Sequence, residues 1–323
     1  MNTLTRIFTG IFVFLCFCFT ACDLTNHKSE CEEYISKAHT EFLAEQYKLS
    51  LADYAKACEL DSTYGQAFEG KGAAEENLND YANALKDEFT ALRLNPELKN
   101  VRSWIGLIKR KMGDYRGSIK YYNKSIELGG SDLAFDYEGR GAAEYDLGEN
   151  DLAMQDETKA IKMDPDVKNA YYWRGLIKGE LKDYDGSLED HFKSLAIGAN
   201  KPRDYEGIAA AEFHLGHYKE ALLYIDSSIS TNDTTLKNVY NWRGHIKQEL
   251  EDYKGAVDDY TTSIAIGKNT GIDYEGRAVN EYYLKDYSSA LRDINTAIAK
   301  DSTLKNTTYW KGEIERDMKH GKH

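Results

Sequence analysis

A helical hairpin recurs along most of this chain, and this recurrence constrains the fold more than any other feature. The clearest copy is Ala170–Ile197, in which apolar residues fall at helical spacing on both sides of Lys182-Asp183-Tyr184. Asp183 stands where the second helix needs a side-chain oxygen to cap its free backbone N–H groups. The same place is held by Asp80, Asp114, Asp252 and Asp286. A hairpin this short cannot bury its apolar faces alone, so we predict that the copies stack on one another.

A small residue in the middle of each first helix marks the period. The series, at intervals of 34 or 35 residues, is Ala38, Gly72, Gly106, Gly141, Gly175, Ala209, Gly244, Ala278 and Gly312. Helix–turn–helix units with this period are the signature of the tetratricopeptide repeat, which the chain resembles over about residues 30–318. The resemblance implies an all-α solenoid, a right-handed superhelix of eight hairpins with a C-terminal capping helix. The hairpins are expected near 31–61, 64–96, 98–129, 133–165, 167–198, 201–232, 236–267 and 270–301, followed by a helix at 306–318 and a tail at 319–323.

A second period of about 69 residues lies on top of the first. All four tryptophans alternate with glycines at one position of successive repeats, in the order Gly70, Trp104, Gly139, Trp173, Gly207, Trp242, Gly276, Trp310. The simplest explanation is a bulky residue packing where its neighbour leaves room, and an aromatic ligand site is the alternative. The repeating unit is therefore predicted to be a double hairpin.

Charges at fixed spacing predict ion pairs. In six hairpins a base precedes the small residue and an aspartate follows sixteen residues later: Lys37 and Asp53, Lys71 and Asp87, Arg140 and Asp156, Arg174 and Asp190, Arg243 and Asp259, Arg277 and Asp293. The other two hairpins have Ile105 with Tyr121 and Ile208 with Tyr224. Sixteen residues lead from one helix to its antiparallel partner, so we predict a cation–carboxylate pair within each of the six hairpins.

A further charge, four residues after the basic position, alternates in sign along the chain. It reads Glu75, Lys109, Glu144, Lys178, Glu212, Lys247 and Glu281. Since first helices of successive repeats are neighbours in a stack, we expect a ladder of ion pairs between repeats. Each acid then has a base beside it, which argues against a catalytic or metal-binding carboxylate cluster. We expect no cofactor, no metal and no enzymatic activity.

The N-terminus differs from everything after it. Arg6 is the only charge in residues 1–21, and Ile7–Phe19 has the length of a signal-peptide apolar core. Phe19-Thr20-Ala21-Cys22 resembles the lipobox of bacterial lipoproteins, in which the cysteine becomes the acylated first residue. This resemblance implies export and anchoring of Cys22 in the inner or outer membrane of a bacterial envelope, with residues 22–30 as a polar tether. Ordinary signal cleavage and an uncleaved anchor are the alternatives.

Two cysteines lie beyond the predicted tether. Cys31 lies near the start of the first helix and Cys58 near the end of the second helix of the first hairpin. Antiparallel helices bring these ends together, and exported proteins retain disulfides, so a bridge is geometrically reasonable. Two separate thiols packed as small hydrophobic side chains are the alternative.

The charge balance and the family resemblance together suggest a partner. A net charge of −13 argues against nucleic acid, whose binding depends on Lys and Arg. The resemblance implies that a protein or peptide binds a concave face lined by first helices. On this chain that groove would include Asn100, Tyr145, Tyr172, Arg203, Phe213, Asn238, Asn241, His245, Gln248 and Tyr282, with Phe42 and a row of Glu69, Glu138, Glu206 and Glu275. The glutamates favour a basic or extended polar partner over an acidic peptide C-terminus, and a solvated acidic face is the alternative.

Two hypotheses of function follow. The first is a non-enzymatic, membrane-tethered scaffold that binds a protein or peptide in the groove and contacts the bilayer only through acylated Cys22. The second is a glycan-binding accessory protein of the cell envelope, with Tyr172 and Tyr282 as stacking platforms for sugars.

Overall fold

The computed structural model describes residues 28–320 apart from 168, 199–200, 232–237 and 268–269. Within these ranges the chain forms helices and no strand, so the predicted all-α fold is confirmed. The predicted signal peptide and Cys22 lie outside the described residues. The chain divides into two compact units, Met1–Pro165 and Asp166–His323, and each is described by itself.

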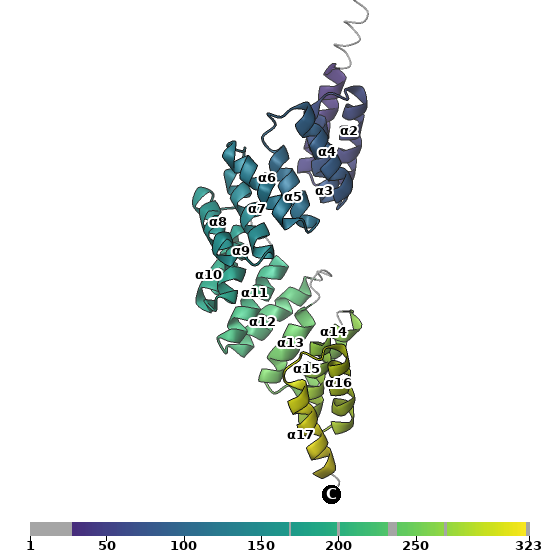
Figure 1. Ribbon diagram of the computed structural model, residues 1–323, viewed down its shortest axis with the longest axis vertical. Helices are drawn as coiled ribbons and strands as arrows, with labels where there is room; N and C mark the ends of the chain where they lie inside the picture. The colour runs from purple at the N-terminus through teal and green to yellow at the C-terminus, as the bar shows by residue number, and fades with distance from the viewer. Residues whose placement is uncertain (1–27, 168, 199–200, 232–237, 268–269, 321–323) are drawn as a thin grey trace, which may run out of the picture. The chain divides into compact units, whose positions relative to one another are not determined.

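Helices follow one another in hairpins through both units (Figure 1). The first unit contains a helix over residues 28–43, then α2 (Tyr47–Leu60), α3 (Gly65–Asn77), α4 (Tyr81–Leu94), α5 (Val101–Lys111), α6 (Tyr115–Glu127), α7 (Leu133–Asp146) and α8 (Asn150–Met163). The second contains α9 (Ala170–Glu180), α10 (Tyr184–Ile197), α11 (Lys201–His214), α12 (Tyr218–Ser230), α13 (Val239–Glu249), α14 (Tyr253–Ala265), α15 (Gly271–Tyr283), α16 (Tyr287–Lys300) and α17 (Thr307–His320). Residues 28–30, expected in the tether, and 319–320, expected in the tail, are helical.

The hairpin turns have one local structure. A residue in the left-handed region, such as Lys182 with φ 64° or Gly113 with φ 81°, reverses the chain just before the second helix. The next residue caps that helix: Asp183 accepts a hydrogen bond from the backbone N–H of Gly186 at 3.0 Å. All five predicted aspartate caps accept such a bond from three residues later: Asp80, Asp114, Asp183, Asp252 and Asp286. The repeated turn therefore fixes the antiparallel hairpin.

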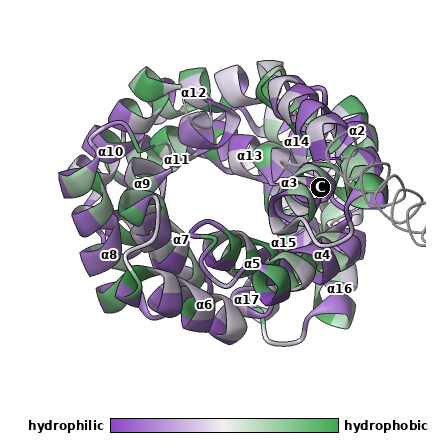
Figure 2. Cartoon of the chain, turned by 90° about the horizontal axis from the view of Figure 1, so that it is seen from above, coloured by the Kyte–Doolittle hydropathy of each residue, from purple (hydrophilic) through white to green (hydrophobic). Residues whose placement is uncertain are grey.

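Stacking within each unit puts the first helices together. α3 contacts α5 and α5 contacts α7 in the first unit, and α9, α11, α13, α15 and α17 contact one another in succession in the second. In the described residues, second helices of successive hairpins make no comparable contact. In the view of Figure 2, α5 and α7 lie inside α6 and α8, and each helix carries both hydrophilic and hydrophobic residues. The first helices thus form one layer within each unit.

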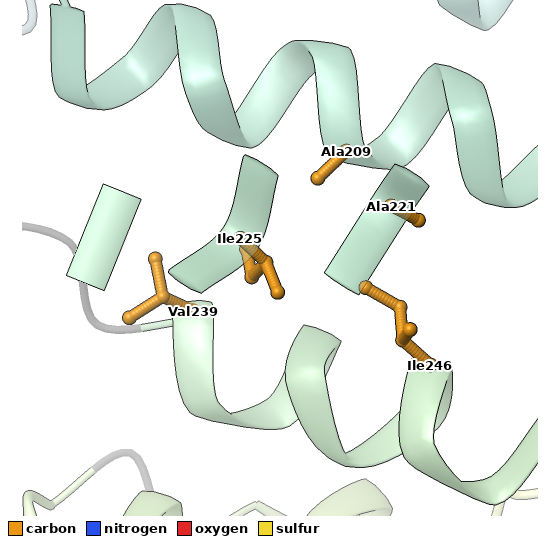
Figure 3. Packing of buried hydrophobic residues seen from close by; sticks show 5 residues of the cluster. All are labelled: Ala209, Ala221, Ile225, Val239 and Ile246. Carbon is orange, nitrogen blue, oxygen red and sulfur yellow. The ribbon is translucent and has the colours of Figure 1, made fainter. Parts of the chain in front are cut away.

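The hydrophobic core is shared between neighbouring hairpins. In one cluster, Ala209 of α11 and Ala221 and Ile225 of α12 pack with Val239 and Ile246 of α13 (Figure 3). All five are almost completely buried. Because three helices from two hairpins build this cluster, a single hairpin cannot bury it, as stacking repeats require.

The 69-residue period arises from a different bulky residue than the tryptophan that we predicted. The room beside the glycines is filled by a Tyr or His from the second helix of the preceding hairpin, and not by tryptophan. The pairs are Tyr54 with Gly70, Tyr122 with Gly139, His191 with Gly207 and Tyr260 with Gly276. The intervening hairpins have Glu88, Glu157, Ile225 and Ile294 in the place of the large residue. There Trp242 and Trp310 pack against the clusters of Ile225 and Ile294. Two kinds of interface therefore alternate.

Candidate functional site

The six cation–aspartate pairs expected from the sequence are present. Arg140 donates two hydrogen bonds to Asp156, from Nε at 2.5 Å and Nη2 at 2.8 Å. The same fork joins Arg174 to Asp190 and Arg243 to Asp259, and single contacts join Arg277 to Asp293, Lys71 to Asp87 and Lys37 to Asp53. In one of the two hairpins without a pair, Tyr121 packs on a cluster containing Ile105. These ion pairs hold the two helices of a hairpin in register. Each of the paired charges already has its partner within the hairpin.

The expected ladder of ion pairs between repeats is wrong. Lys178 Nζ lies 2.8 Å from Asp190 Oδ2, and Lys247 Nζ lies 2.8 Å from Asp259 Oδ2, so both lysines join the pair of their own hairpin. The reason is that the side chain four residues after the basic position faces the second helix of its own hairpin, and not the next repeat. Inter-repeat ion pairs come from the next two positions, where Arg110 bonds Asp146 at 2.7 Å and Lys111 bonds Glu76 at 2.5 Å.

The cysteines of the first hairpin are free thiols. Cys31 is fully buried, and its S–H donates to the carbonyl oxygen of Ala57 at 3.6 Å. Cys58 packs against the cluster of Cys31, Ala57 and Ala67, and burial raises the pKa of its thiol to about 12. The structure therefore matches the alternative interpretation, in which both act as small hydrophobic side chains, rather than a disulfide.

Buried carboxyl groups are the main electrostatic feature of the first unit. Burial raises the pKa values of Glu75 and Glu144 to about 7. Glu88 and Glu157 are fully buried, and burial raises their pKa values well above the usual range. Neither oxygen of either carboxyl group has a hydrogen-bond partner among the described residues. A buried carboxyl group without a partner favours its protonated form.

The stability of this unit should depend on the ionisation of Glu157. Because folding raises its pKa, the folded chain holds a proton that the unfolded chain has released, so stability is present at low pH and is lost as pH rises. Glu157→Gln is expected to change little at pH 4 and to raise the free energy of unfolding by about 1–3 kcal/mol at pH 9. Urea unfolding across this pH range measures it, with exposed Glu127→Gln as control. An equal gain at every pH would contradict the prediction.

Part of the predicted groove forms in the second unit. A cavity of about 500 Å³, the C-terminal groove, is lined by Phe213, Asn238, Asn241, Trp242, His245, Thr270, Ile272 and Asp273. Its polar groups already have internal partners: Asn241 Nδ2 donates to Asp273 Oδ1 at 2.8 Å. The His245 ring lies edge-on to Tyr260 with centroids 5.5 Å apart, and burial lowers the pKa of His245. Four predicted groove residues are thus brought together.

The other predicted groove residues of the second unit make internal contacts. Tyr172 is only 8% exposed, receives a hydrogen bond from Arg203 and meets His191 edge-on at 5.8 Å. Gln248 accepts from Asn280 Nδ2 at 2.8 Å, and the Tyr282 hydroxyl donates to Asp317 Oδ2 at 2.7 Å. Tyr172 therefore offers no open ring face to a sugar, and its expected role as a stacking platform is wrong.

The first unit contains a larger cavity, the N-terminal groove, of about 630 Å³. Its apolar wall comes from the helix over residues 28–43, α2 and α5, and consists of Ile35, Phe42, Leu43, Tyr54 and Trp104. Its polar lining includes Glu32, His39, Gln66, Glu69 and Asn100, and no Lys or Arg is among its described lining residues. Asn100 donates a side-chain hydrogen bond to Glu69. Tyr145, also predicted for the groove, is half-buried on α7 and does not line this cavity.

Sequence reasoning assigned Phe42, Glu69 and Asn100 to the groove but missed Leu43 and Trp104. Leu43 is 70% exposed at the end of its helix, a position at which an apolar residue has no packing role. An apolar residue at this exposed helix end was the sequence signal that could have assigned Leu43 to the groove. No described helix has the length and apolar character needed to cross a bilayer, and no group of three metal-ligating side chains occurs in the described residues.

Comparison with known proteins agrees with this fold. The family model described as tetratricopeptide repeat matches residues 101–128. The TPR repeat-containing protein MJ1428 of Methanocaldococcus jannaschii is 24% identical over 237 residues, 67% of this chain and 41% of that protein. The Lipoprotein NlpI homolog of Haemophilus influenzae is 27% identical over 151 residues, 46% of this chain and 45% of that protein. The chain spans less than half the length of these curated relatives.

A solved structure gives the same picture of the fold. The APC/C hetero-tetramer Cut9-Hcn1 aligns with a TM-score of 0.70 at 15% identity, covering 87% of this chain and 55% of that chain. At this identity the likeness concerns the fold alone. The matched repeat, the relatives and the stacked helical hairpins together support a tetratricopeptide repeat protein.

Proposed function

We propose that this chain is a non-enzymatic scaffold that binds a protein or peptide, with the N-terminal groove as its main site. Tetratricopeptide repeats mediate protein–protein interaction. The observation that carries the proposal is the groove itself, about 630 Å³ with exposed Leu43, Trp104 and Glu69 in its lining. This volume and mixed lining suit a few side chains of a bound peptide.

The groove also explains why peptide binding is favoured over glycan binding. Sugar binding by stacking requires an aromatic face open to solvent. Tyr172 is buried, and Tyr282 is packed among Tyr283, Tyr287 and Trp310. The N-terminal groove combines the rings of Phe42 and Trp104 with exposed Leu43, and this mixed apolar lining contributes through the burial of apolar area.

We further propose that the scaffold is exported and held on a bacterial membrane by acylated Cys22. The lipobox resemblance supports this, and so does the similarity to a relative named a lipoprotein. Expressed in a bacterial host, the chain is expected to incorporate alkyne-palmitate and to sediment with membranes, and Cys22→Ser to lose both properties. Equal labelling and sedimentation of the two chains would contradict the anchor.

Replacing Leu43 by aspartate should remove peptide binding without unfolding the chain. Leu43 is 70% exposed, so the charge is tolerated by the fold but replaces apolar wall by carboxylate. Random short peptides displayed on phage are selected on the full chain, and the affinity of the selected peptides is expected to fall at least tenfold in Leu43→Asp. The matched control is Leu223→Asp, a leucine 64% exposed on α12 outside both grooves.

Either of two results would contradict the proposal: selection of no peptide above background, or equal loss of binding in the Leu43 and Leu223 variants. Circular dichroism melting of both variants shows that the fold is kept.

A further inference from the structure

Two carboxyl pairs in the first unit occupy equivalent positions, 69 residues apart, and all four members except half-buried Glu69 are buried. Glu69 of α3 lies near Glu88 of α4, and Glu138 of α7 lies near Glu157 of α8, since the first member of each pair raises the pKa of the second. Glu88 and Glu157 are fully buried, and their carboxyl oxygens have no hydrogen-bond partner among the described residues. The two sites thus begin with the same chemistry.

Among the described residues, a cation acts on the fully buried glutamate of the later site and not on that of the earlier one. Arg110 of α5 is near enough to Glu157 to lower its pKa, and its side chain is largely buried. Around Glu88, by contrast, the charges that act on its pKa are acids alone, on Glu69, Asp87 and Glu75.

The base two residues after Glu69 is already engaged. Lys71 of α3 lies 2.6 Å from Asp87 Oδ2 and 3.5 Å from Glu75 Oε1. Asn100 donates a side-chain hydrogen bond to Glu69, and no base among the described residues shifts the pKa of Glu69. The carboxyl pair therefore lacks the cation that the later pair has.

The sequence position that supplies the cation holds an aromatic residue at the earlier site. Arg110 stands four residues after Gly106, and the equivalent position, four residues after Ala38, is Phe42. Phe42 is half-buried, and its ring lies 5.4 Å from that of Tyr47. In place of a guanidinium group, this site has the N-terminal groove, whose lining includes Phe42 and Glu69.

We infer that the N-terminal groove receives an arginine or lysine side chain of the bound partner, which reaches Glu69 and takes the role that Arg110 plays in the following double hairpin. This inference rests on the proposed peptide-binding function and names the chemistry of the partner. The apolar stem of such a side chain would lie along Phe42 and Trp104, whose ring faces attract a cation. Arginine is favoured, because its planar fork can bond a carboxylate with two N–H groups.

The charge of the groove supports this choice of partner. Glu32 and Glu69 line it and no Lys or Arg does so in the described residues, while the whole chain carries a net charge of −13. An acidic peptide would meet repulsion, and a neutral apolar peptide would leave Glu69 desolvated without a cation. A basic residue within an apolar segment would complement both the apolar and the acidic lining residues of the groove.

The test compares peptides selected from a random phage-displayed library on the full chain and on Glu69→Gln. Peptides selected on the unaltered chain should be enriched in Arg or Lys, and their affinity should fall at least tenfold in Glu69→Gln. Exposed Glu59→Gln, which lies outside the groove, is the control and should bind as the unaltered chain does. Citrulline in place of the enriched Arg should cause a similar loss.

A second variant tests the comparison with Arg110 directly. Phe42→Arg supplies the cation from within the chain and should abolish binding of the basic peptides, whereas Phe42→Leu should retain most of it. Selected peptides without enrichment in Arg or Lys, or basic peptides that bind Glu69→Gln equally well, would overturn this inference. If Leu43→Asp still removed binding in that case, the proposed function would stand. Selection of no peptide would overturn both.

Discussion

Asp190→Asn is expected to destabilise the hairpin of α9 and α10 by about 3–5 kcal/mol, because two half-buried cations lose the buried carboxylate that they share. Asp190 is 1% exposed and accepts from Arg174 Nε at 2.8 Å and Nη2 at 2.7 Å. Lys178 Nζ lies 2.8 Å from the same carboxylate. Asparagine keeps the shape but leaves two positive charges side by side, each partly removed from water.

Another hairpin of the same chain shows which substitutions should restore the lost stability. In the hairpin of α5 and α6, isoleucine and tyrosine take the places of the Arg and Asp, and Lys109 bonds the capping aspartate Asp114 at 2.7 Å. The equivalent cap beside Lys178 is Asp183. Arg174→Ile combined with Asp190→Tyr should therefore recover most of the stability, with Lys178 turning to Asp183.

Urea unfolding and hydrogen exchange in α9 and α10 measure this cycle, since stability in a repeat array is local. A double variant as unstable as the sum of Asp190→Tyr and Arg174→Ile would show that the two residues are independent. The control is Asp53→Asn, whose partner Lys37 is mostly exposed, and it should cost much less.

These pairs could be predicted because one chain contains eight versions of the same hairpin. Six charge pairs and two Ile–Tyr combinations at one spacing define a contact, much as a family alignment would. The turns were predictable for a similar reason, as the position of Asp183 leaves the N-terminal N–H groups of α10 one nearby acceptor. Repetition therefore revealed what is shared by every copy.

Features that distinguish one copy from another were predicted less well. The charge of Lys178 alternates with its neighbours in sequence, but spacing does not show whether a long side chain turns to its own hairpin or to the next. Tyr172 and Phe213 both occupy first helices, yet Tyr172 is buried while Phe213 lines a cavity. Grooves depend on which side chains the neighbours leave uncovered, and this is a property of packing in three dimensions.

Gly139→Ala is expected to destabilise the first unit by about 3 kcal/mol, although alanine is the better helix former. A Cβ atom at this position would lie 2.3 Å from Cζ of Tyr122, a residue of α6 whose ring is fully buried. The ring cannot move without losing its contact with Gly106 in its own hairpin. The added methyl group therefore has to push two hairpins apart, and thermal unfolding should detect the change.

Two comparisons identify the Tyr122 contact as the cause. Gly312→Ala, at a helical glycine whose Cβ would meet nothing within 4 Å, should stabilise α17 by up to about 1 kcal/mol. In a Tyr122→Ile background Gly139→Ala should cost little, because at equivalent positions Ile225 leaves room for the larger Trp242. An equal cost of Gly139→Ala in both backgrounds would mean that the glycine serves some other purpose, and that the 69-residue alternation does not arise from these rings.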